Sequence, residues 1–147
     1  MKTSAFAGLA AQVDKPFRVH IIHPATGRTV ADKDGNPAFI EVLSADSTAA
    51  ETFDRERQRK LNDAAKSTLL AGTATPDDET PEVVAKLAAL TSAWHLVDIA
   101  TGEVIDVPCT PENAQELYVS RATRWIYLQV MPQAANIANF LPPSSKG

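Results

Sequence analysis

The three histidines and the single cysteine are the residues of this chain best suited to bind a metal ion or to act as nucleophiles. His20 and His23 are three residues apart, in and just after a segment from Phe17 to Ile22 whose alternating apolar and polar residues predict a strand. Residues i and i+3 of a strand point to opposite faces, so both imidazoles reach one metal ion only if the chain bends after Ile22. Neither His95 nor Cys109 has a neighbour at the spacing of a zinc site. The sequence therefore predicts no metal site and no cofactor.

Carboxylates and glycines also give no complete catalytic or ion-binding motif. The segment from Asp32 to Gly35 begins like a calcium-binding loop, but Leu43 stands where the loop needs its last carboxylate. A hairpin turn is the interpretation that we favour for it. The chain has no G-x-S-x-G elbow, no phosphate-binding P-loop and no G-x-G-x-x-G segment. We therefore expect a protein that is not an enzyme and has no catalytic residues.

The amino-acid composition of the chain limits the kinds of molecule that it is expected to bind. The chain has 147 residues, of which 44% are hydrophobic and 22% charged, as in an ordinary globular domain. Its 14 basic and 18 acidic side chains give a net charge of −4, which argues against nucleic acid as the main partner. The longest apolar runs are about seven residues, far short of the roughly 20 that a membrane helix needs. We expect a cytoplasmic protein that binds neither nucleic acid nor membrane.

The order of predicted elements indicates an α+β fold with two short antiparallel hairpins and about four helices, one of them long and charged. Whether the hairpins form two small sheets or share one is left open. We expect a flexible N-terminal arm over residues 1–15, a single domain over 16–141 with a linker near 72–81, and a flexible tail over 142–147. The hairpins are predicted at 17–43 and 94–107, and the helices at about 48–70, 81–92, 111–121 and from 123 onward, where Pro132 should kink or split the last one.

The long helix is unusual because its middle is polar on every side. Arg55, Arg57, Arg59 and Lys60 alternate there with acidic and amide side chains. Such a helix is expected to project from the core or to lie against another chain. Two roles stay open for it: a solvated face that keeps the protein soluble, or a docking surface for an acidic protein segment.

The C-terminal quarter is the most apolar part of the chain. A helix with apolar residues on two sides must be covered on both, by its own domain or by a partner. We therefore predict that this region binds a partner protein, through the side chains Trp125, Ile126, Leu128, Val130, Ile137, Phe140 and Leu141.

Several short segments stand in a characteristic order along residues 17–141. The first half combines an alternating strand, two turns and the start of a charged helix, in Phe17, Val19, Ile21, His23, Pro24, Thr26, Gly27, Asp34, Gly35, Pro37, Asp46 and Ser47. The second half combines Trp94, Gly102, Glu103, the run from Cys109 to Asn113, Leu117, Tyr118, Trp125, Ile126, Gln129, Val130 and the run from Asn139 to Leu141. Together they resemble the tail assembly chaperones of long-tailed bacteriophages.

This resemblance implies a role without catalysis in the cytoplasm of the bacterial host. A tail assembly chaperone holds the long, helical, aggregation-prone tape measure protein soluble and helps to recruit tail tube subunits around it. The implied partners are therefore the tape measure protein and the tail tube protein, and self-association of the chain is left open. The alternative class is a structural component of the virion, such as a capsid decoration protein or a minor tail protein.

Overall fold

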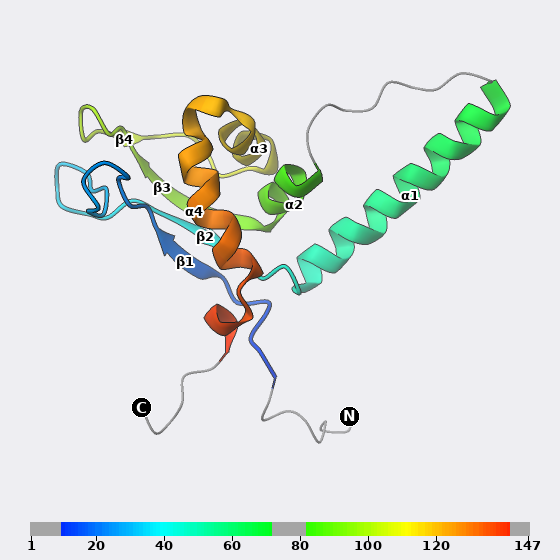
Figure 1. Cartoon of the computed structure of the whole chain (residues 1–147), viewed down its shortest axis with the longest axis horizontal. Helices are drawn as coiled ribbons and strands as arrows, with labels where there is room; N and C mark the ends of the chain where they lie inside the picture. The colour runs from blue at the N-terminus through cyan, green and yellow to red at the C-terminus, as the bar shows by residue number, and fades with distance from the viewer. Residues whose placement is uncertain (1–9, 72–81, 142–147) are drawn as a thin grey trace.

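Four strands form one antiparallel sheet in the order β1-β2-β3-β4. The structure, a computed structural model, describes residues 10–71 and 82–141, with the backbone alone for 67–71 (Figure 1). The strands are β1 (Phe17–His20), β2 (Phe39–Val42), β3 (Thr91–Val97) and β4 (Val104–Ile105). Both predicted hairpins are confirmed. They share one sheet because β2 also pairs with β3, where Ile40 lies opposite Trp94.

Four α-helices and two short 3-10 helices complete the α+β fold in the described residues, so the predicted fold class is confirmed. They are α1 (Thr48–Ala71), α2 (Glu82–Leu90), α3 (Pro111–Val119), η2 (Arg121–Thr123), α4 (Arg124–Ala135) and η3 (Ile137–Phe140). The Ser47 hydroxyl accepts a hydrogen bond from the Ala50 N–H (3.2 Å) and so caps α1. Thr110 caps α3 in the same way, at the N–H of Asn113 (3.1 Å). The predicted linker near 72–81 lies outside the described residues.

One face of the sheet and helices α2, α3 and α4 enclose the hydrophobic core. Directly paired residues of antiparallel strands share a face, which places the apolar side chains of all three longer strands together. On the other face, the Arg18 guanidinium lies over the Phe39 ring, 3.8 Å from its centroid. The most deeply buried large side chains of the core are Ile40, Val42, Leu87, Tyr118 and Val130.

Helix α1 projects from this body, as Figure 1 shows. Its first turns are held by Ala50, which is buried, and by an ion pair between Asp54 and Lys86 of α2 (3.0 Å). From Gln58 to Lys66 every side chain is exposed. The expectation that a helix polar on all sides projects from the core agrees with this arrangement.

Helix α4 continues through Pro132, which was expected to kink or split it. Proline removes the hydrogen bond to the carbonyl of Leu128, four residues earlier. Leu128 and Pro132 are both exposed, so water can solvate that carbonyl. The helix therefore does not split at this point.

The described part of the predicted N-terminal arm is tied to the domain by hydrogen bonds. The Gln12 N–H donates to the carbonyl of Phe140 (2.6 Å). The Asp14 carboxylate accepts from the backbone N–H of Thr48 (2.7 Å) and from its hydroxyl (3.1 Å), at the start of α1. These contacts bring the two ends of the domain to the base of the projecting helix.

Candidate protein-binding groove

Three of the seven predicted partner-binding residues belong to the core. Ile126, Val130 and Phe140 are buried within the chain itself, with Val130 having no exposed surface at all. Ile126 and Val130 lie one turn apart on the face of α4 that meets the sheet, and both belong to the core cluster. These three side chains pack in the interior of the domain and are not accessible to a partner.

The other four predicted residues are at least partly open. Leu128, Ile137 and Leu141 are exposed, Leu128 by 56%. Trp125 is half-buried, with its ring 6.5 Å from that of His23. The region therefore retains an exposed apolar part, but nothing in the described residues groups these side chains around a cavity.

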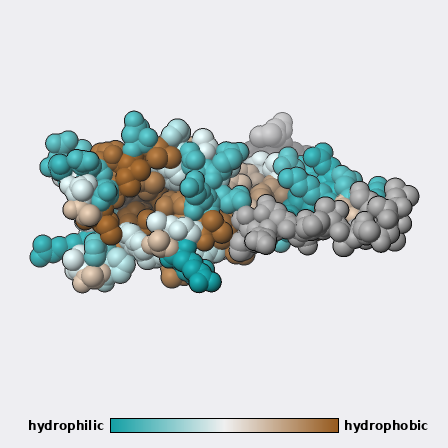
Figure 2. All heavy atoms as spheres, turned by 90° about the horizontal axis from the view of Figure 1, so that it is seen from above, coloured by the Kyte–Doolittle hydropathy of each residue, from teal (hydrophilic) through white to brown (hydrophobic). Residues whose placement is uncertain are grey.

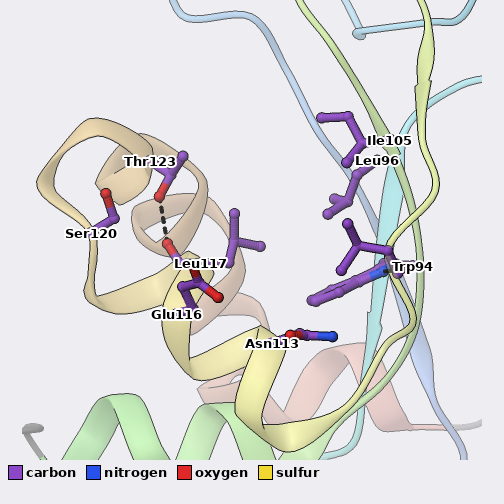
Figure 3. A pocket seen from close by; sticks show the side chains of 9 residues that line it. Trp94, Leu96, Ile105, Asn113, Glu116, Leu117, Ser120 and Thr123 are labelled. Carbon is purple, nitrogen blue, oxygen red and sulfur yellow. Dashed lines mark hydrogen bonds between the residues drawn. The ribbon is translucent and has the colours of Figure 1, made fainter.

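A hydrophobic groove lies instead between the β3–β4 hairpin and the α3–η2 turn (Figure 3). Its volume is about 310 Å³. Seen from above in Figure 2, a hollow with largely hydrophobic walls lies in the body of the molecule, away from the projecting helix. The groove is lined by Trp94, Leu96, Ile105, Val107, Asn113, Glu116, Leu117, Ser120 and Thr123.

The register of the sheet explains why this groove is open. Leu96 pairs with Ile105, so both side chains lie on the core face. Leu96 is 9% exposed, whereas Ile105 on the edge strand is 41% exposed. The helices that cover the core face therefore stop short of β4 and leave apolar surface uncovered at this edge.

Two hydrogen bonds fix the walls of the groove. The Trp94 indole Nε1 donates to the carbonyl of Val107 (2.8 Å), which holds the ring against the segment after β4. On the opposite wall, the Thr123 hydroxyl donates to the carbonyl of Leu117, as the dashed line in Figure 3 shows. This second bond closes the turn from α3 into η2, so the groove is preformed.

The charged side chains at the groove are acidic. Glu116 is the one charged residue among those that line it, and Glu112 lies one turn earlier on α3. Both are exposed, and neither belongs to an ion pair of the described residues. Asn113 is engaged with the carbonyl of Pro108 (2.9 Å). An apolar floor with a polar rim is also the arrangement found in protein–protein interfaces.

Asp32, the first residue of the segment that begins like a calcium-binding loop, has a structural role. The Asp32 carboxylate accepts the backbone N–H of Asn36 (3.0 Å), the main reason why its pKa lies below the ordinary value. It also meets His95 Nε2 at 2.8 Å and the Asp34 N–H at 2.9 Å, as in a stabilised turn. Within residues 10–71 and 82–141, no three potential metal ligands cluster.

Cys109 is a half-buried free thiol next to β3. Burial raises the pKa of its thiol, which disfavours the reactive thiolate. Its Sγ lies 3.9 Å from the carbonyl of Thr91, to which the thiol donates weakly.

Sequence reasoning missed the groove because its walls come from four elements. Trp94 and Leu96 lie on β3, and the residues opposite them on α3 are not adjacent to them in the sequence. One local signal was present: Val104, Ile105 and Val107 place apolar side chains on both faces of a short strand, so both faces need cover from the domain or from a partner.

None of the described helices combines the length and the hydrophobicity needed to cross a bilayer. No protein-family model matches the sequence, and the comparisons with curated proteins and with solved structures also gave no match.

Proposed function

We propose that this chain is a non-enzymatic tail assembly chaperone of a long-tailed bacteriophage. In the host cytoplasm it would keep the tape measure protein soluble and help to recruit tail tube subunits. The order of segments described above supports the family, and the preformed apolar groove supports the binding of a protein client. The groove is the observation that carries the proposal.

The physical requirements of such a chaperone match the described features. A protein that holds an aggregation-prone client needs open apolar surface, because burial of apolar area drives association. It also needs a charged surface that keeps the complex in solution. Ile105 and Val107 at the groove offer the first, each 41% exposed, and the projecting part of α1 offers the second.

Co-expression with the tape measure and tail tube proteins tests this proposal. Tape measure protein made alone should sediment with aggregates, and tape measure protein made with this chain should stay soluble and be recovered with it by affinity capture. A chain carrying Ile105→Asp, which places a charge in the groove, serves as the internal comparison. Tape measure protein that aggregates equally with and without the chain would contradict the proposal.

Mass spectrometry of purified particles separates this function from a structural role in the virion. A chaperone is expected to be missing from mature particles, or present only in traces. High copy number in the particle would instead favour a capsid decoration protein or a minor tail protein.

A further inference from the structure

We propose that the groove receives an amphipathic helix of the client protein, whose apolar stripe is flanked by lysine or arginine. This inference rests on the proposed chaperone function and assigns the client a place on the chain. The apolar side chains of the client helix would enter between Trp94 and Leu117, and the basic side chains of that helix would face Glu112 and Glu116 on α3.

The short edge strand argues for a helix over an added strand. Strand addition needs a row of free backbone groups. β4 has two residues, Val104–Ile105, after which the Val107 N–H turns back to the carbonyl of Ile105 (3.0 Å). Pro108 then lacks an N–H. The edge strand β4 therefore has few free backbone groups that could form hydrogen bonds with a client. Client side chains inserted into the groove must supply most of the binding free energy.

The dimensions of the groove suit side chains presented by a helix. Residues three or four apart on a helix lie about 5–6 Å from one another and form a single row. The groove, at about 310 Å³, has room for a short row of apolar side chains and is too small for a whole helix. The client helix would therefore lie along the opening, above Ile105 and Val107, and extend the helical layer over β4.

The charges on α3 select a basic client. Glu112 and Glu116 are at i and i+4, so they lie on one side of the helix. A parallel or antiparallel helix carrying Lys or Arg with the same spacing would pair with both of them, as flanking charges do between packed helices. Arg121 follows Ser120 in the sequence but does not line the groove. A client with acidic flanks would be repelled by the two glutamates.

Synthetic peptides provide the test. The first probe is a fluorescently labelled helical peptide with leucine at i, i+3, i+4 and i+7 and lysine on both sides of that stripe. The second has the same leucines and glutamate in place of every lysine. Fluorescence anisotropy measures the dissociation constant of each with the full chain, at low and at physiological salt.

Three variants locate the binding site. Ile105→Asp should weaken binding of the lysine peptide about tenfold or more, because it places a charge on the groove floor. The pair Glu112→Gln and Glu116→Gln should weaken it about three- to tenfold and reduce its salt dependence. Val83→Asp is the matched control, since Val83 is 51% exposed on α2 and does not line the groove; it should change binding less than about twofold. Circular dichroism checks that each variant is folded, and Val107→Asp replaces Ile105→Asp if the latter unfolds.

Binding that is lost in Ile105→Asp and kept in Val83→Asp supports the proposal. Equal binding of the lysine and glutamate peptides, no binding of either, or full binding to Ile105→Asp would overturn it. The same variants in the tape measure solubility assay separate the two proposals. If tape measure protein stays soluble with Ile105→Asp, the chaperone function stands and the groove is not its site. If the lysine peptide binds in the groove but tape measure protein aggregates, the groove stands and the chaperone function fails.

Discussion

The hydrogen bond between Tyr118 and Thr91 connects α3 to the first residue of β3 and should make a measurable contribution to stability. The Tyr118 hydroxyl lies 2.7 Å from Thr91 Oγ1, and the Tyr118 side chain is almost completely buried. Thr91 Oγ1 also lies 2.8 Å from the carbonyl of Leu87 and donates to it. A threonine hydroxyl has one proton, so Tyr118 must be the donor in the first bond.

The two substitutions at this bond should differ in cost. Tyr118→Phe removes a donor and leaves Thr91 still bonded to Leu87, so we expect a loss of about 1 kcal/mol in the free energy of unfolding. Thr91→Val leaves both the Tyr118 hydroxyl and the Leu87 carbonyl without this partner, which should cost about 1–3 kcal/mol. The double variant should cost less than the sum, by about 1 kcal/mol, because the shared bond is lost only once.

Urea unfolding followed by circular dichroism measures these differences. With a slope of about 1–3 kcal/mol per molar urea, a loss of 1 kcal/mol lowers the midpoint by roughly 0.3–1 M. Costs of Tyr118→Phe and Thr91→Val that add within about 0.3 kcal/mol would refute the assigned bond.

The pH dependence gives a second check on Tyr118. Burial is the main cause that raises its pKa above the ordinary value. In the unfolded chain this phenol ionises near pH 10, while in the folded chain it stays neutral. The folded state then binds more protons, so stability falls as pH rises above about 10, by up to about 1.4 kcal/mol per pH unit. Tyr118→Phe should be less sensitive to pH in this range than the wild type; equal slopes would contradict the reasoning.

Three further predictions concern contacts between distant segments. Hydrogen bonds lower the pKa of Asp32 in the folded chain, so its ionised carboxylate stabilises the fold above about pH 4. This stabilisation is lost as the pH falls through the pKa of the folded state. Asp32→Asn, which also alters the contact with His95, should therefore make the melting temperature less dependent on pH at acid pH, as measured by thermal unfolding. Asp14→Ala removes the carboxylate at the start of α1 and should cost about 1 kcal/mol in urea unfolding, with Asp14→Asn restoring part of it. The Gln129 amide both donates to and accepts from the backbone of Ile22 (2.7 and 2.8 Å), so Gln129→Glu, which loses the donor, should destabilise by about 1 kcal/mol; a neutral result would mean that water replaces the bond.

The hairpins and helix starts could be predicted because their signals are local. The Asp-Gly turn before β2 illustrates this, since Gly35 has a φ of +85°, which glycine adopts without strain. The helix predicted from residue 111 likewise begins at Pro111, the start of α3, with Thr110 as its cap. The pairing of β2 with β3 could not be predicted, because it joins segments separated by the whole of α1 and α2. Nothing in either strand specifies a partner so distant in the sequence.

The candidate site was harder to predict than the fold. Hydrophobicity marks a residue that must be covered, but it does not say whether the domain or a partner covers it. Val130 and Phe140 are covered by their own chain, while Ile105 on a two-residue strand is not. That distinction depends on where the helical layer ends relative to the sheet, which is a property of the assembled fold.

The projecting helix also affects how the size of the molecule is measured. At 1.5 Å per residue, the 24 residues of α1 extend about 36 Å, whereas a compact chain of this length has a radius of gyration of about 15 Å. Gel filtration reports hydrodynamic radius, so a 15.8 kDa monomer with such an arm should elute as a larger particle and resemble a dimer. Light scattering measures molecular mass independently of molecular shape. The number of chains in solution should therefore be determined by light scattering.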